Sequence, residues 1–322
     1  MTQSPAWLDS ICSTGLYEDA SRLYDNSEGR QWILPMVRRK GRPESLTSQA
    51  SPPSSWGIGG VIAPGGVTVE DVKAVFSDLS ALPFLRTTIR PNPLHGSVWA
   101  AAAPAEVVAV PRVSHVLDLD GGFDHVWMKR FNGKTRNKIR RAEKAGLTIE
   151  RDISGELLPV FYELFLQSVC RWASKQHEPM WMARWRARRR DPITKFESIS
   201  KALGDSCRLW IARYHGQPAA AILVLQGANA HYTRGAMNKD LAGPTLANYL
   251  LHRVAIEEAC KAGCRYYHMG ETGSSGSLAQ FKTHFGAEAF AYAEYRLERL
   301  PISKLDQRLR GIVKRIIGFQ DV

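Results

Sequence analysis

The chain has 322 residues, a length that allows about two compact domains and excludes a single small module. Hydrophobic residues make up 44% of the sequence and charged residues 23%, which excludes wholesale disorder. Lysine and arginine together number 43 against 31 acidic residues, and the net charge of +12 favours anionic partners such as nucleic acid, a nucleotide, coenzyme A or an anionic lipid headgroup.

The cysteines and the hydropathy pattern indicate the compartment. Five cysteines lie mostly among apolar neighbours and without CxxC spacing, at positions 12, 170, 207, 260 and 264. They predict free thiols in a reducing environment rather than a disulfide framework or a zinc site. The N-terminal residues lack the pattern of a secretory signal, and no stretch reaches the ~18 apolar residues of a membrane span. We therefore expect a cytoplasmic protein without a transmembrane segment and without a bound metal.

The first half shows a faint order of strand, loop, helix and strand. The expected elements are a strand over 31–38, a loop over 49–66, a helix over 69–79 and a strand over 84–90. Within the loop, Trp56, Gly59 and Gly60 are candidates for a pocket that binds the acceptor of a reaction. An ordinary glycine turn is the alternative interpretation.

The second half has clearer periodicity. The expected elements are a basic helix over 134–144, a strand over 147–151, a helix around 161–172, strands over 207–214, 219–226 and 231–237, a helix from 243 to 262, a strand over 264–269, a helix over 277–284 and a strand over 288–298. This alternation predicts a mixed α/β sheet. The faint similarity in order between the two halves suggests an internal structural repeat.

Three stretches resemble a known superfamily. KTRNKIRRAEKAGLTIE at 134–150 is similar to the basic helix and following strand of Fem-type aminoacyltransferases and related GNAT acyltransferases, while AIEEACKAGCRYYHMG at 255–270 and LAQFKTHFGAE at 278–288 are similar to their helix, strand and Phe-Lys-x-x-Phe-Gly segment. The resemblance implies an α/β fold of two tandem GNAT-like domains, the first one degenerate. The implied parts are an acceptor-side domain over 1–128, an acyltransferase domain over 129–300 and a C-terminal helix over 301–322.

The resemblance also implies a reaction. Members move an aminoacyl group from aminoacyl-tRNA, or an acyl group from acyl-CoA, onto an amine. The acetyl-CoA signature Arg/Gln-x-x-Gly-x-Gly/Ala is absent before the helix at Pro244, which favours aminoacyl-tRNA as co-substrate, with no tightly bound cofactor. An acyl-CoA-dependent N-acyltransferase acting on an amino sugar or another small amine is one alternative. A non-catalytic nucleic-acid-binding module on a decayed GNAT fold is another.

Candidate catalytic residues follow from the chemistry and from the resemblance. Aminolysis needs a neutral amine held against a carbonyl, and positive charge where the oxyanion develops. Lys282 follows a turn rich in glycine and serine in the Phe-Lys segment, so its ammonium could lie near that oxygen or near the acceptor end of tRNA. Phe281 could stack on a terminal base. Glu271 could orient the incoming amine. The alternative is that Lys282 is a solvated helix lysine and Phe281 a core residue.

Other residues are candidates for donor binding. Gly243 and Thr245 lie at the expected start of a helix, where free N–H groups attract phosphate. Strand alternation places Tyr232 and Arg234 on one face, where the guanidinium could hold a phosphate or a carboxylate. Ordinary helix capping and a structural salt bridge are the alternatives.

Two basic clusters predict a surface for tRNA or another polyanion. Arg136, Arg140 and Lys144 are four residues apart and share a helical face. Arg186 and Arg189 belong to a cluster in which arginines alternate with tryptophans, a combination suited to phosphate contacts and stacking. Solvated charged faces are the alternative.

The C-terminal segment predicts a basic amphipathic helix. Leu305, Leu309, Ile312 and Ile316 follow a spacing of four, three and four residues, with lysines and arginines between them. Such a helix could pack onto the body of the protein. Alternatively, it could rest on an anionic membrane surface.

Overall fold

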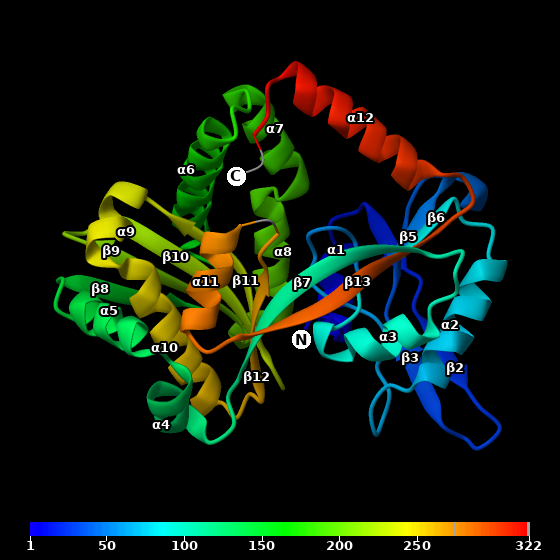
Figure 1. The fold of residues 1–322 in the computed structure, drawn as a ribbon, viewed down its shortest axis with the longest axis horizontal. Helices are drawn as coiled ribbons and strands as arrows, with labels where there is room; N and C mark the ends of the chain where they lie inside the picture. Colours follow the sequence, from blue (N-terminus) through cyan, green and yellow to red (C-terminus); the bar gives the residue numbers. More distant parts are fainter. Residues whose placement is uncertain (274, 321–322) are drawn as a thin grey trace. The chain divides into compact units, whose positions relative to one another are not determined.

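The computed structural model describes residues 1–273 and 275–320 (Figure 1). The chain forms two compact units. Unit 1 comprises Met1, residues 114–289 and the residues from 313 onward, and unit 2 comprises residues 2–113 and 290–312. Strands β7 (Val108–Asp118) and β13 (Glu288–Glu298) contribute residues to both units.

Unit 1 is built on a mixed sheet in the order β7-β12-β11-β10-β9-β8. Besides β7, its strands are β8 (Leu147–Asp152), β9 (Cys207–Tyr214), β10 (Gln217–Gln226), β11 (Ala230–Met237) and β12 (Tyr266–Glu271). All neighbours pair antiparallel except β11 and β12, which are parallel.

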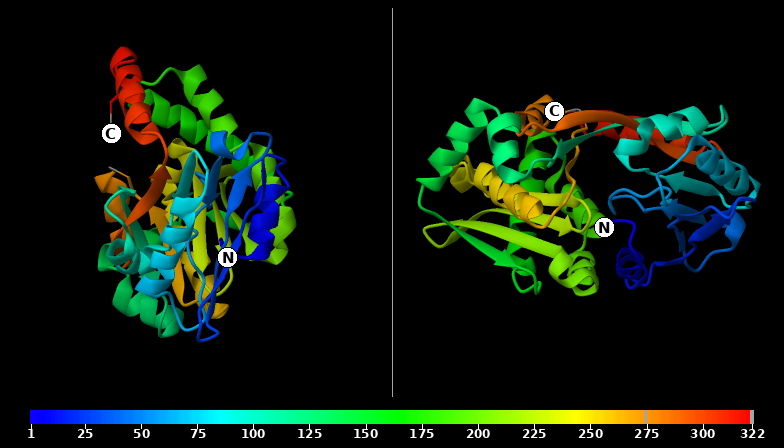
Figure 2. Two further views of the ribbon diagram at one scale, coloured as in Figure 1. Left: turned by 90° about the vertical axis from the view of Figure 1, so that its right-hand side faces the viewer. Right: turned by 90° about the horizontal axis from the view of Figure 1, so that it is seen from below.

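Helices cover both faces of this sheet (Figures 1 and 2). Both α10 (Ala247–Lys261) and α6 (Leu158–Lys175) pack on β10, which is buried from Ala219 to Gln226. Ala220, Ile222 and Val224 belong to the core cluster that contains the apolar side chains of α10, so the alternate residues of β10 face α6. The remaining elements are α4 (Gly122–His125), a π-helix (Val126–Arg130), α5 (Gly133–Glu143), α7 (Met180–Arg190), α8 (Ile193–Leu203), a 3₁₀ turn (Gly204–Ser206), α9 (Lys239–Thr245) and α11 (Gly276–His284).

Unit 2 has its own sheet and core. Its sheet has the order β1-β4-β5-β6-β13, and its core packs Phe76 and Trp99 of two helices against Tyr295 of β13. The elements are α1 (Pro5–Cys12), β1 (Tyr17–Asp19), a hairpin of β2 (Arg22–Asp25) and β3 (Gln31–Leu34), β4 (Val37–Arg39), β5 (Ser48–Ser51), α2 (Val69–Ala81), β6 (Arg86–Ile89), α3 (Gly96–Ala102), 3₁₀ turns at Glu44–Leu46 and Pro93–His95, and the start of α12 (Ile302–Ile316).

The structure corrects several sequence expectations. The expected helix from 243 to 262 is two helices, because Asn238 caps a helix that begins at Lys239 and Leu246 takes a left-handed conformation with φ of 57°. Gly243 and Thr245 therefore lie at the end of α9 and do not begin a helix. The expected strand over 31–38 is β3 and β4, and part of the expected loop over 49–66 is β5.

Candidate active site

The site begins where the parallel strands β11 and β12 part. They pair at Ala230 with Tyr267 and at His231 with His268, and the described ladder ends there. Directly beyond, a bulge at Thr233 on β11 interrupts the pairing with β10. A bulge bends its strand and disrupts the local ladder, so β11 changes its pairing with both neighbours at this level of the sheet.

A second bulge lies on the other strand of this opening. On β12, His268 pairs with Val116 and Gly270 with His115, which leaves Met269 as the bulged residue. The two bulges thus occupy the same level of the sheet, one on each side of the opening. The opening is the place where the β11–β12 pairing ends, and it is bordered by Tyr232 on β11 and by Gly270 and Glu271 on β12.

The side chain of Lys282 reaches the end of this opening. Helix α11 begins after Ser275, which caps its first turn, and it carries Lys282 in its last turn. The side chain is buried, and its Nζ donates hydrogen bonds to the carbonyls of Gly270 at 2.7 Å and Glu271 at 2.8 Å. Burial lowers the pKa of Lys282 to about 8, against the opposing effect of the Glu271 carboxylate. At neutral pH the group is still mainly a charged ammonium.

The histidines near Lys282 are neutral. Burial, together with the charge of Lys282, lowers the pKa of His252 to about 3 and also lowers the pKa of His115. His252 Nδ1 lies 3.3 Å from the hydroxyl of Tyr267, and its ring centroid is 4.7 Å from that of Tyr232. Neither histidine adds positive charge, so Lys282 carries the positive charge at this end of β12.

Phe281 belongs to an aromatic wall beside Lys282. Its ring centroid lies 5.0 Å from Tyr249, 5.4 Å from His252 and 5.2 Å from Phe285. Lys138 of α5 contacts this aromatic cluster, since its Nζ donates a hydrogen bond to the Tyr249 hydroxyl at 2.8 Å. Phe281 therefore contributes to packing within unit 1. Its stacking on a nucleic-acid base stays a prediction.

The bulge at Thr233 overturns one sequence prediction. Tyr232 pairs with Val224 and Arg234 with Leu223, so the two side chains lie on opposite faces of the sheet instead of sharing one. Tyr232 faces α10, and burial raises the pKa of its hydroxyl to about 12. An extra residue in the strand shifts the alternation by one position, which the simple period of two does not anticipate.

Arg234 ends in a buried ion cluster on the α6 face. Its Nη2 lies 2.6 Å from Oδ2 of Asp191, which is also bonded by Lys195 Nζ at 2.8 Å and by Arg190 Nε at 2.8 Å. Asp191 is buried, but the three cations hold the pKa of its carboxyl well below its usual range. Burial lowers the pKa of Lys195 to about 8. These contacts support the structural salt bridge as the role of Arg234.

Gly243 and Thr245, which the sequence places at a helix start, lie inside α9. The Thr245 hydroxyl donates to the carbonyl of Leu241 at 2.6 Å and is buried, while Gly243 is exposed in α9. The helix start that the sequence places at Gly243 lies instead after Leu246, where α10 begins and the Tyr249 N–H donates to the Leu246 carbonyl at 2.9 Å. The prediction that Gly243 and Thr245 bind phosphate depends on a helix start at these residues, and the structure does not have one there.

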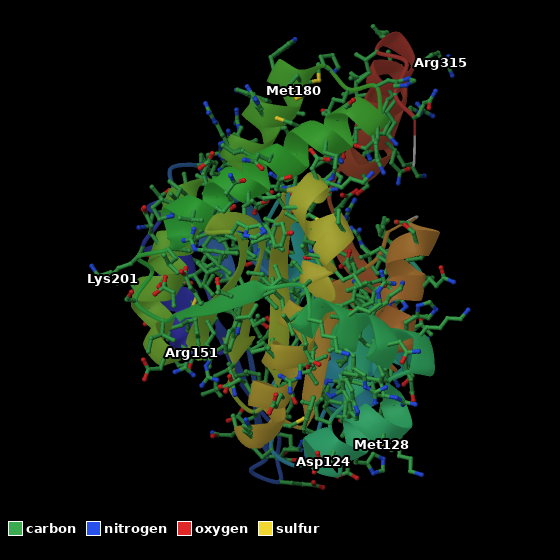
Figure 3. All side chains as sticks on the ribbon, turned by 90° about the vertical axis from the view of Figure 1, so that its left-hand side faces the viewer. Asp124, Met128, Arg151, Met180, Lys201 and Arg315 are labelled. Atoms are coloured by element: carbon green, nitrogen blue, oxygen red, sulfur yellow. The ribbon has the colours of Figure 1, made fainter. Side chains whose placement is uncertain are left out.

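The basic clusters divide into structural and exposed arginines. Nη1 of Arg136 donates to the carbonyls of Trp127 at 3.1 Å, Met128 at 3.2 Å and Phe131 at 2.6 Å, so this residue caps the π-helix. Arg140 lies 5.9 Å from the ring centroid of Trp127, and Lys144 is exposed. Figure 3 shows this side of unit 1, with Met128 labelled.

Helix α7 carries the second cluster. Nη2 of Arg186 lies 2.7 Å from Oε2 of the buried Glu178, whereas the guanidinium of Arg189 lies 5.3 Å from the ring centroid of Trp185. Trp181 and Trp185 are exposed. An exposed tryptophan with an arginine over it fits the predicted stacking and phosphate contacts, while Arg186 has a structural partner.

In unit 2, the glycine loop is packed inside. Trp56 is buried against Trp7, with ring centroids 5.6 Å apart. A Cβ at Gly59 would lie 2.6 Å from the backbone of Ser51, and Gly60 has a positive φ of 85°. Close packing and backbone conformation thus explain these residues by themselves. Their role at an acceptor stays a prediction.

Sequence reasoning missed several residues of unit 1. They are His115, Asp191 and His252, each of which interacts with a predicted site residue or shares its cluster. One signal was available: Asp191 and Lys195 are four residues apart, the spacing of an ion pair on a helix. The others come together through tertiary packing.

Comparisons with known proteins agree with this geometry. Residues 129–283 match the family model of the GNAT acetyltransferase domain. No curated protein sequence matches the chain. FemX has a similar structure at 14% identity, covering 95% of this chain and 94% of FemX with a TM-score of 0.65. A conserved protein of unknown function from Bacteroides thetaiotaomicron matches at 10% identity, 91% of both chains and a TM-score of 0.54.

A third solved structure is described as the C-terminal domain of a putative lysylphosphatidylglycerol synthetase from Agrobacterium fabrum. It matches at 14% identity, covering 93% of this chain and 95% of that domain, with a TM-score of 0.50. The segment 129–283 therefore matches a GNAT acetyltransferase domain, and the solved structures show that the fold of the chain is similar to theirs. Over nearly its whole length the fold is similar to that of FemX, which confirms the expected Fem-type resemblance and the α/β fold class with a mixed sheet. In the described residues, no helix has the length and apolar character needed to cross a bilayer.

Proposed function

We propose that the chain transfers an aminoacyl group from aminoacyl-tRNA to the amine of a small acceptor, such as a cell-wall precursor or a natural-product intermediate. The observation that carries this proposal is the buried ammonium of Lys282 at the end of β12, beside the opening between β11 and β12. A fixed positive charge in a place with little water is the device that stabilises an oxyanion.

The reaction balances without a cofactor. The neutral amine attacks the ester carbonyl, a C–N bond forms, and negative charge develops on the carbonyl oxygen. Collapse of this intermediate breaks the C–O bond to the ribose, and the proton lost by the attacking nitrogen goes to the leaving ribose oxygen. In this account Lys282 stabilises the oxyanion and Glu271 orients the amine. The hydroxyl of Tyr232 stays protonated, since its pKa is raised to about 12. It can therefore donate a hydrogen bond to the aminoacyl-tRNA.

Exposed basic residues of unit 1 support tRNA as the donor. Arg140, Lys144 and Arg189 lie on α5, at its end and on α7. Each phosphate that they neutralise would release counterions and so strengthen binding at low salt. The net charge of +12 fits the same partner.

Acyl-CoA is the second candidate donor. Residues 129–283, which include Lys282, match the model of a GNAT acetyltransferase domain. This match favours acyl-CoA as the donor. The oxyanion chemistry would be identical, with a thiolate leaving instead of a ribose oxygen.

The test uses purified full-length chain with mixed aminoacyl-tRNA, and separately with acyl-CoAs, in the presence of candidate amines. We expect loss of the aminoacyl ester to depend on both enzyme and amine. If acyl-CoA is consumed and aminoacyl-tRNA is not, acyl-CoA is the donor instead of aminoacyl-tRNA. If neither donor reacts and RNA still binds, the chain is a nucleic-acid-binding module and the enzymatic proposal fails.

A further inference from the structure

We propose that α12 is an interfacial helix that docks the protein on membranes containing anionic phospholipid. The helix shares no residue with the Lys282 site, so the proposal does not depend on the donor or acceptor of the reaction. It rests on three properties of the helix: an exposed apolar stripe, an excess of basic residues, and a polar anchor on the side away from the stripe.

The apolar stripe is continuous and exposed. Leu305, Leu309, Ile312 and Ile316 have exposed fractions between 52% and 77%, and Val313 has 46%. At 100° per residue, these five side chains fall within about 100° of the helix circumference. A stripe of this width on a soluble helix ordinarily faces the protein core. Here the side chains of the stripe are exposed.

The charges on the helix select the partner. Its residues include Lys304, Arg308, Arg310, Lys314 and Arg315, with Asp306 as the single acid. Lys304, Arg308 and Arg315 fall within about 40° of one another and border the apolar stripe. Figure 3 shows Arg315 projecting from the helix. Basic side chains beside an apolar face match the headgroups and the acyl boundary of an anionic leaflet.

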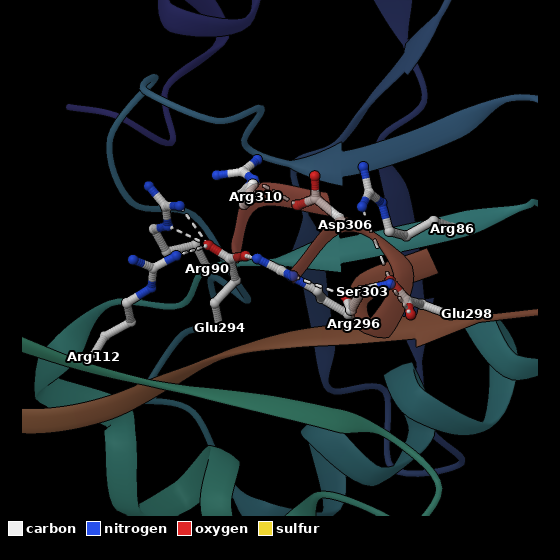
Figure 4. A network of polar contacts seen from close by, with 9 residues as sticks. All are labelled: Arg86, Arg90, Arg112, Glu294, Arg296, Glu298, Ser303, Asp306 and Arg310. Atoms are coloured by element: carbon white, nitrogen blue, oxygen red, sulfur yellow. Dashed lines mark hydrogen bonds and ion pairs between the residues drawn. The ribbon is translucent and has the colours of Figure 1, made fainter. Parts of the chain in front are cut away.

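A polar network holds the first turn of the helix on unit 2 (Figure 4). Ser303 is buried, its Oγ accepts a hydrogen bond from Arg296 at 2.7 Å, and its N–H donates to Glu298 at 2.9 Å. Arg296 in turn bonds Glu294, which also binds Arg90 and Arg112. Ser303 points about 130° away from the centre of the apolar stripe. Its hydrogen bonds to unit 2 therefore do not cover the side chains of the stripe.

The network is itself strongly held. Burial of Glu294 is opposed by the guanidiniums around it, and the pKa of its carboxyl falls to about 2. The ion pairs therefore persist at any physiological pH. The helix start is fixed to unit 2 through charged groups, while the apolar side chains contribute little to the core.

The test is flotation of the full chain with phosphatidylcholine vesicles, with and without phosphatidylglycerol. We expect binding only to the anionic vesicles, weakened by added salt. Leu309→Asp should lower the binding constant at least about tenfold, because it places a charge in the stripe. Gln307→Asp is the matched control: it adds the same charge to the same helix on the opposite face, and it should retain most of the binding.

Three results would overturn the proposal. The first is absence of wild-type binding to anionic vesicles, and the second is equal loss of binding in both variants. The third is a wild-type dimer in solution that Leu309→Asp dissociates, which would assign the stripe to a second copy of the chain. Both substituted side chains are exposed, so circular dichroism should show that the variants fold.

Discussion

Replacing Lys282 by methionine separates a catalytic role from a structural one. The substitution keeps most of the volume of the side chain and removes its charge. The pKa of Lys282 falls from 10.5 in the unfolded chain to about 8 in the folded one, so at pH 7 the folded state is less stable by about 3 kcal/mol than it would be with an unperturbed amine. Removing the charge removes this cost.

The same substitution leaves two carbonyls without their donor. Gly270 and Glu271 each lose a hydrogen bond, at about 1 to 3 kcal/mol for each unsatisfied group. The two effects are similar in size and opposite in sign, so we expect the free energy of unfolding to change by no more than about 3 kcal/mol. Loss of an oxyanion donor, by contrast, lowers the rate by about 10²- to 10³-fold.

The assay is single-turnover transfer at saturating donor and acceptor, together with urea unfolding of each variant. Lys201→Met, an exposed lysine on α8, is the control for the chemical change (Figure 3). A wild-type rate for Lys282→Met would refute the catalytic role. A rate that falls only in proportion to the folded fraction would make Lys282 structural.

Three further predictions concern charge. Asp191→Asn leaves three cations around a buried neutral group, and it should lower the free energy of unfolding in urea by about 3 to 5 kcal/mol; an unchanged midpoint would contradict the ion cluster. Reversing Arg140 and Lys144 to Glu should weaken tRNA binding severalfold and reduce its salt slope by about 0.7 to 0.9 for each phosphate that is no longer neutralised, whereas an unchanged slope would remove α5 from the interface. His252 and His268 have folded pKa values of about 3 and about 4 against 6.5 when unfolded, so unfolding takes up protons as the pH falls. Stability should therefore decrease from pH 6.5 to pH 4 by about 1.4 kcal/mol per pH unit for each histidine, and a double Gln variant that keeps this slope would disprove the assignment.

Regular periodicity was enough to predict several elements of both units. The alternation of 288–298 matches β13, and the 3.6-residue spacing around Phe161 and Phe165 lies within α6. These signals are local, because one buried face repeats along one element. The same argument holds for α12, whose amphipathic pattern is visible in the sequence, although its exposure is not.

Features set by tertiary structure were not predictable in this way. The bulge at Thr233 arises from pairing with β10 and reverses the facing of Arg234. The break between α9 and α10 depends on Leu246 in a left-handed conformation that residues other than glycine seldom adopt. Strand β7 contains Pro111, which counts against a strand in any reading of the sequence alone.

The candidate site shows the same division. The Phe-Lys segment led to Lys282, and the structure places that residue at the opening between β11 and β12. Arg136 and Arg140 looked equivalent by spacing, yet Arg136 is bonded to three carbonyls of the π-helix region. Residue spacing predicts which face of a helix a side chain occupies. It does not predict which backbone carbonyls that side chain will bond in the folded protein.

The pH dependence of the transfer step tests the central claim most directly. If the ammonium of Lys282 stabilises the oxyanion, the single-turnover rate is lost as the pH rises through the pKa of that group, which lies at about 8 instead of 10.5. We therefore predict a falling limb centred near pH 8 in the wild-type enzyme, absent from the residual activity of Lys282→Met. A wild-type rate that keeps rising from pH 8 to pH 10.5 would contradict the account.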